Sequence, residues 1–141
     1  MSNIWRYLFL RTRSLHNTNS FDTIIMRKIN KIGFFLIDLT SKTQNGSCKW
    51  EEISSKVYRL QLKTGSIKFS AVYHPEYDCY DFILELYDMK KCFYTIYGSK
   101  ITDRNDNHFE ALNSLYEIIE AWNKAKIDSK FSSLENEIRA M

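Results

Sequence analysis

The chain has 141 residues, of which 44% are hydrophobic and 15% aromatic, so it can build the core of one domain and is not typical of disordered proteins. Its net charge is +3, with lysine and arginine scattered among 17 acidic residues, which is too weak and too mixed to indicate a dedicated nucleic-acid-binding protein. The three cysteines are an odd number and form no C-x-x-C pair, which favours a reduced, cytoplasmic setting over a disulfide-stabilised secreted one.

Residues 1–20 form a basic segment without acidic side chains, and they include the apolar run 7–10. Three interpretations are open: an arm that binds a membrane surface, an organelle targeting segment, or an extension upstream of an original start at Met26. We favour an extension of little structural consequence and expect residues 21–141 to form a single domain. No apolar run approaches the ~20 residues that a membrane-spanning helix requires.

The spacing of apolar residues changes along the chain and predicts the order of the elements. From Ile25 to Leu39 they recur every three to four positions, which predicts a helix over residues 21–42 that ends at Asn45-Gly46. They then alternate, as one face of a sheet requires, in segments separated by short turns, and such neighbouring strands pair antiparallel. The predicted strands are 48–53, 57–63, 67–73, 79–87 and 92–97.

Helical spacing returns from Phe109 to Trp122, and Asn107 with Glu110 resembles a capping box at the start of this helix. We expect this helix to break at residues 126–128 and a shorter, weakly amphipathic helix to start near Ser132. We therefore predict an α+β domain, an antiparallel meander of about five strands with the N- and C-terminal helices packed on one face. In the helix that starts after Asn107, the side chains expected to face the sheet are Phe109, Leu112, Tyr116, Ile119 and Trp122.

Two single residues carry specific expectations about the sheet. Gly65 lies in the turn before the third strand, where it can take the positive φ that tight turns require. Trp50 is the largest apolar side chain of the first strand, and we expect it to anchor the core and not to serve as a ligand platform.

No motif in the chain indicates a reaction. Phosphate-binding, dinucleotide-binding and zinc-protease signatures are absent, and the three histidines lie in three different segments. His74 lies near Asp78 and Cys79, and Cys79 can in principle pair with a histidine as a nucleophile. A polar turn and a packed strand cysteine explain these residues as well, so we expect no enzyme, no metal and no cofactor.

The solvent side of the predicted sheet carries basic and aromatic side chains together. Such a face can stack bases and contact phosphates. Asp81 and Glu85 fall on the same face, where cross-strand pairs explain the mixture without a ligand, and the apolar members can equally form a protein-docking patch. The candidate interaction residues are Arg59, Lys63, Lys68, Ile83, Tyr87 and Tyr97.

Residues 35–50 carry a short signature, a helix ending in Leu-x-x-x-Thr-x-x-Gly and then Lys-Trp, followed by a meander and a closing helix. This pattern is similar to that of a group of small, mostly uncharacterised bacterial and phage proteins, from Met26 to about Ile127. The resemblance implies the α+β fold and a bacterial or mobile-element setting, and it implies no activity and no catalytic residue. The matching residues are Leu39, Thr43, Gly46, Lys49 and Trp50.

Taken together, the sequence favours a non-enzymatic protein-interaction module of a bacterium or mobile element, such as an adaptor, an immunity-type protein or a defence-associated accessory protein. The expected partner is another protein or a second copy, bound at the open sheet face or at the strand edge 92–97, which can join two copies into one sheet. The alternative is an accessory nucleic-acid-binding protein that uses Arg59, Lys63, Lys68 and Tyr87.

Overall fold

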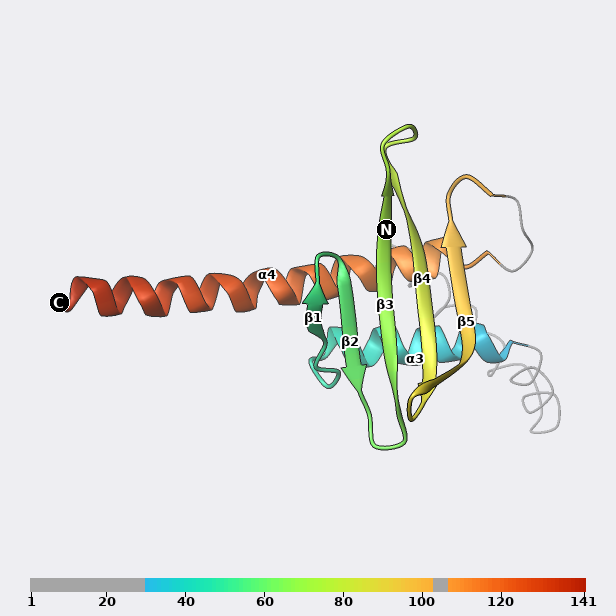
Figure 1. Cartoon of the computed structure of the whole chain (residues 1–141), viewed down its shortest axis with the longest axis horizontal. Coiled ribbons are helices and arrows are strands. Elements are labelled where there is room, and N and C mark those ends of the chain that lie inside the picture. The colour runs from blue at the N-terminus through green and yellow to red at the C-terminus, as the bar shows by residue number, and fades with distance from the viewer. Residues whose placement is uncertain (1–29, 103–106) are drawn as a thin grey trace, which may run out of the picture.

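The computed structural model describes residues 30–102 and 107–141, and this part of the chain has the predicted α+β fold. Figure 1 shows one five-stranded sheet with both described helices on the same face. The strands follow in the order β1-β2-β3-β4-β5, and every neighbouring pair is antiparallel, as predicted. The elements are α3 (Lys31–Gln44), β1 (Glu51–Ser54), β2 (Val57–Gln61), β3 (Gly65–His74), β4 (Cys79–Asp88), β5 (Lys91–Ser99) and α4 (Phe109–Arg139).

The beginning of the first strand differs from the prediction. β1 starts at Glu51 and not at Cys48, because the backbone N–H of Cys48 donates to the carbonyl of Lys42 and so belongs to the end of α3. Trp50 therefore lies just before the strand. The part of the predicted N-terminal helix before residue 30 and the basic segment 1–20 lie outside the described residues.

The strand register separates the sheet into an inner and an outer face. Tyr58 pairs with Phe69, Phe69 with Leu84 and Leu84 with Ile96, so these four side chains form one row across the sheet. All four are buried, and α3 and α4 lie behind the sheet on this inner side in Figure 1. The alternation read from the sequence therefore identified the covered face.

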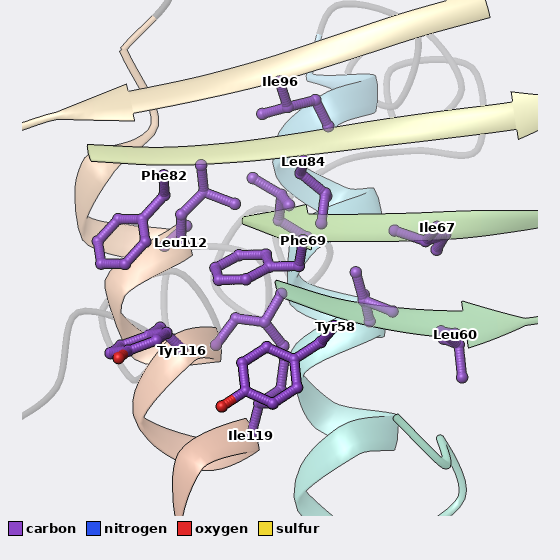
Figure 2. Close-up of a cluster of buried hydrophobic side chains, with 14 residues drawn as sticks. Tyr58, Leu60, Ile67, Phe69, Phe82, Leu84, Ile96, Leu112, Tyr116 and Ile119 are labelled. Atoms are coloured by element: carbon purple, nitrogen blue, oxygen red, sulfur yellow. The ribbon is translucent and has the colours of Figure 1, made fainter. Parts of the chain in front are cut away.

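The core is a layer of aromatic and aliphatic side chains between the inner face and the two helices. Figure 2 shows side chains of β2 to β5 on one side of this layer and Leu112, Tyr116 and Ile119 of α4 on the other. The ring of Phe69 lies 5.7 Å from that of Phe82 and 6.2 Å from that of Tyr116. Most of the apolar surface buried by the described residues is concentrated here.

The signature at the end of α3 is a connected group of hydrogen bonds. The indole N–H of Trp50 donates to Thr43 Oγ1 over 3.0 Å, and the Thr43 hydroxyl donates to the carbonyl of Leu39 over 2.8 Å. Gly46 ends the helix at a φ of +85°, as predicted. Trp50 is half-buried and packs against the core, and its ring forms a T-shaped pair with that of Phe69, with 6.3 Å between the centroids.

The C-terminal helix differs most from the prediction. α4 is one continuous helix of 31 residues, Phe109–Arg139, with no break at residues 126–128. The segment contains no glycine or proline, so nothing in the backbone ends the helix there. Trp122 also departs from the expected inner stripe, since 51% of it is exposed.

The roles expected for Gly65 and Asn107 were wrong. Gly65 does not adopt a positive φ; it is required because a Cβ there would lie 2.1 Å from the carbonyl oxygen of Tyr87 on the neighbouring strand. Asn107 does not cap α4. Its amide group instead accepts from Ser99 N over 2.8 Å and donates to Ser99 O over 2.7 Å, which fixes the loop before α4 to the end of β5.

Candidate interaction surfaces

An uncovered apolar stripe lies on the second half of α4. Figure 1 shows α4 running across the sheet and continuing far beyond β1. Every residue from 124 to 141 is exposed. We call residues 109–123 the proximal segment and 124–139 the distal segment; the distal stripe is Ile127, Phe131, Leu134 and Ile138, which are 42%, 63%, 58% and 68% exposed.

The distal stripe continues the buried face of the proximal segment. Leu112, Tyr116 and Ile119 pack on the sheet, and the same three-to-four-residue spacing leads through Asn123 to Ile127 and along the distal stripe. Apolar positions therefore recur at helical spacing on both sides of the polar Asn123, and only those of the proximal segment are covered by the sheet. The apolar spacing was visible in the sequence, but the helix break expected at residues 126–128 prevented it from being read as one continuous helix.

Charged residues flank the distal stripe and differ in sign along it. Lys124, Lys126 and Lys130 lie in its first half, together with Asp128. The second half carries Glu135, Glu137 and Arg139, and Arg139 forms an i,i+4 ion pair with Glu135 at 3.7 Å. Such exposed pairs contribute only a few tenths of a kcal/mol to a helix.

The outer face of the sheet is polar, and most of its charges are paired. Arg59, Lys68, Glu85 and Thr95 form one row across β2 to β5. Lys68 Nζ lies 3.9 Å from Glu85, and the Tyr87 hydroxyl donates to the same carboxylate over 3.3 Å. Cross-strand pairing therefore accounts for most of the charge mixture expected on this face.

A second polar group on the outer face joins three strands. Asp81 of β4 is buried, and its Oδ2 lies 2.7 Å from His74 Nε2 and accepts from the Tyr97 hydroxyl over 3.0 Å. Burial raises the pKa of the Asp81 carboxyl, but its hydrogen bonds lower the pKa more, so the group stays ionised below the usual range. This arrangement stabilises a buried carboxylate at the β3–β4 end of the sheet.

Cys79 lies beside this group without joining it. The register places Cys79 directly opposite His74. No hydrogen bond links the thiol to the imidazole, and the described residues contain no cluster of histidine, cysteine or acidic side chains able to hold a metal ion. The three cysteines are unpaired and half-buried.

The six candidate residues predicted from the sequence do not form one patch. Five of them lie on strands of the outer face, whereas Lys63 lies in the β2–β3 turn. Arg59 is exposed, and Ile83 is half-buried. Lys68 and Tyr87 share the Glu85 carboxylate, and the Tyr97 hydroxyl donates to Asp81. The β5 edge does expose apolar side chains, with Phe93 62% and Tyr94 45% accessible.

The partly buried carboxylate of Glu120 links the proximal segment of α4 to β2. Glu120 accepts hydrogen bonds from the Tyr58 and Tyr116 hydroxyls, the second over 2.6 Å, and pairs with Lys56. Burial raises the pKa of Glu120, but the hydrogen bonds from its three donors lower it by more, so its pKa lies below the ordinary value. Burial and the hydrogen bond to Glu120 raise the pKa of Tyr58, so the phenol stays neutral. The position and charge of Glu120 are therefore explained by its role in attaching α4 to β2.

An open cleft of about 440 Å³ lies where the β2–β3 and β4–β5 turns meet α3. Its walls are largely apolar, and its lining residues include no histidine, cysteine or lysine. It does not bring an acid–base pair together. The lining side chains include Phe35, Leu62, Leu86 and Phe93.

Comparison with known proteins gives no relative. No family model, no curated protein and no solved structure matches the chain. Within the described residues, neither helix is apolar enough over a sufficient length to cross a membrane.

Proposed function

We propose that this chain is a non-enzymatic protein-interaction module and that the distal stripe of α4 is its contact surface. The observation that carries the proposal is a four-residue apolar stripe on a helix that leaves its own domain. Amphipathic helices bind partners through anchors spaced in this way. The sequence favoured the same functional class but assigned the contact to the sheet.

The physical cost of leaving the stripe bare supports the proposal. An isolated helix shorter than about 12–15 residues is marginal in water, and most helical stability in proteins comes from packing of an apolar face. The distal segment makes no such packing within the described part of the chain and includes weak helix formers such as Asp128, Ser132 and Ser133. A partner that covers the stripe supplies the missing packing.

The test is a pulldown with variants on two faces of the same helix. Phe131→Gln with Leu134→Gln removes the centre of the stripe and keeps a good helix former at both positions. Ser132→Gln with Asn136→Gln is the matched control on the opposite face of the helix. A stoichiometric protein retained by wild type and by the control, and lost with the stripe variant, supports the proposal; retention by the stripe variant contradicts it.

The nucleic-acid alternative is carried by Arg59, which is exposed and has no ion-pair partner among the described residues. The pairing of Lys68 with Glu85 argues for a weaker basic face than the sequence suggested. Nuclease treatment and a salt series in the same pulldown separate the two functions, because phosphate contacts weaken steeply with salt. Capture of nucleic acid alone, lost with Arg59→Ala, would favour the alternative.

A further inference from the structure

We infer that the occupant of the distal stripe is a second copy of this chain, with the two distal segments packed side by side and antiparallel. The inference rests on the proposed function and names its partner. It depends on the spacing of the stripe, on its symmetry under reversal and on the charges beside it.

The spacing of the stripe is that of a coiled-coil seam. Ile127, Phe131, Leu134 and Ile138 are separated by four, three and four residues, which is the d-a-d-a pattern of a two-stranded coiled coil. A groove-binding helix needs only a broad apolar face, whereas this stripe is narrow and has polar residues on both sides. The distal segment is therefore suited to another helix of the same kind.

The stripe is also complementary to itself when one copy is reversed. In an antiparallel pair, Ile127 of one copy packs against Ile138 of the second, and Phe131 packs against Leu134. The same two contacts recur on the other side of the two-fold axis, which gives four consecutive apolar layers without a gap. A two-fold pair of this kind is closed and leaves no half of the stripe bare.

The charges distinguish the antiparallel from the parallel arrangement. Residues 124–132 contain three lysines and one aspartate, a net of +2, and residues 133–141 contain two glutamates and one arginine, a net of −1. Reversal places the basic half of one copy on the acidic half of the other and sets Lys130 beside Glu137 twice. In a parallel pair, Lys124 of one copy would instead lie against Lys124 of the other at a seam position, and the two like charges would repel.

On one side of the antiparallel pair, two acidic side chains repel each other, and this repulsion limits the expected affinity of the dimer. Asp128 of one copy faces Glu135 of the second, and Arg139 partly offsets this repulsion because it already pairs with Glu135. With only four apolar layers, we expect a reversible monomer–dimer equilibrium and not an obligate dimer.

The first experiment is sedimentation equilibrium of the full chain over a concentration series from about 1 to several hundred micromolar, a range set by typical reversible association. The mass of wild type should rise from 16.8 kDa towards twice that value. The Phe131→Gln/Leu134→Gln variant should remain monomeric, and the Ser132→Gln/Asn136→Gln control should behave as wild type. Circular dichroism and thermal melting of each variant check that the domain is folded.

Charge reversal then tests the orientation. Lys130→Glu and Glu137→Lys should each raise the dissociation constant by roughly tenfold at low salt, because two attractive pairs become repulsive. The double variant Lys130→Glu/Glu137→Lys should restore the affinity. Glu137 has no charged neighbour three or four positions away on its own helix, whereas Lys130 has Lys126 four positions before it. Circular dichroism of each charge variant therefore checks that the helix itself is unchanged.

The outcomes are distinct. A chain that stays monomeric throughout overturns the inference, and if it still captures another protein through the stripe, the proposed function stands without it. Dimerisation that survives the stripe variant overturns the inference and indicates another surface, such as the β1 or β5 edge. Rescue by Lys130→Glu/Glu135→Lys, and not by Lys130→Glu/Glu137→Lys, indicates a parallel pair and overturns the antiparallel arrangement.

Discussion

The two halves of α4 have the same apolar periodicity and opposite surroundings. In the proximal segment Leu112 and Leu115 are fully buried, and the Glu120 cluster closes the end of the packed region. In the distal segment the corresponding side chains of the stripe are about half exposed or more. The difference shows that an amphipathic pattern reports how a helix can pack, whereas the size of the sheet decides how much of that helix is covered.

The largest expected effect comes from the same leucine-to-alanine substitution made in each half of α4. Leu115→Ala should lower the free energy of unfolding by about 2–5 kcal/mol, because it opens a cavity in the core. Leu134→Ala should change it by less than about 0.5 kcal/mol when the chain is dilute. Urea unfolding followed by circular dichroism measures both. Equal losses would mean that the distal segment is packed within its own chain.

The next largest effect concerns the attachment of the proximal segment to β2. Glu120→Gln should cost about 2 kcal/mol, because a neutral amide cannot satisfy the three donors that converge on the carboxylate. Tyr116→Phe, which removes one of these hydrogen bonds, should cost less. A neutral result for Glu120→Gln would show that core packing alone holds this part of α4.

The pH dependence of stability provides an independent check on Glu120. Its folded-state pKa is lowered, so its contribution is complete at pH values above the ordinary glutamate pKa and disappears as the pH falls through the lower folded-state value. Wild type should therefore lose stability more steeply than Glu120→Gln in acid. Parallel stability curves for the two proteins would contradict this role.

Two glycines of the first helix region should respond in opposite directions to the same change. Gly46→Ala should cost about 1–2 kcal/mol, because Gly46 has a left-handed φ of +85° that alanine adopts poorly. Gly33→Ala should stabilise by about 0.5–1 kcal/mol, because Gly33 lies within α3 and no atom lies within 4 Å of the added Cβ. Thermal unfolding of both variants measures the difference.

The smallest effect is expected on the outer face of the sheet. Lys68→Ala should change the free energy of unfolding by less than about 0.5 kcal/mol, because its ion pair with Glu85 is partly exposed and long. Urea unfolding at two salt concentrations tests this expectation. A loss above 1 kcal/mol that salt abolishes would assign the face a larger structural role.

The sequence was sufficient for the sheet because alternation is a local signal. The period-2 segments and short turns led to five strands in the correct order, and their inner side proved to be the covered one. The helix stop at Gly46 was also readable, since few residues other than glycine adopt that conformation.

The errors have a common physical cause, which is that the competing interaction lies far away in the sequence. Gly65 is required by a carbonyl on a neighbouring strand, and the amide of Asn107 is engaged by β5 instead of capping α4. The candidate site was missed for a different reason. The spacing of Ile127, Phe131 and Leu134 was visible, but exposure depends on where the sheet ends, which no local pattern reports.

The length of α4 also determines how the molecule moves through water. A helix of 31 residues is about 46 Å long at 1.5 Å per residue, which exceeds the diameter of a domain of this size. The resulting rod gives the particle a large hydrodynamic radius for its mass. A single copy should therefore elute early from a size-exclusion column calibrated with spherical standards, so its retention volume would imitate that of a heavier species.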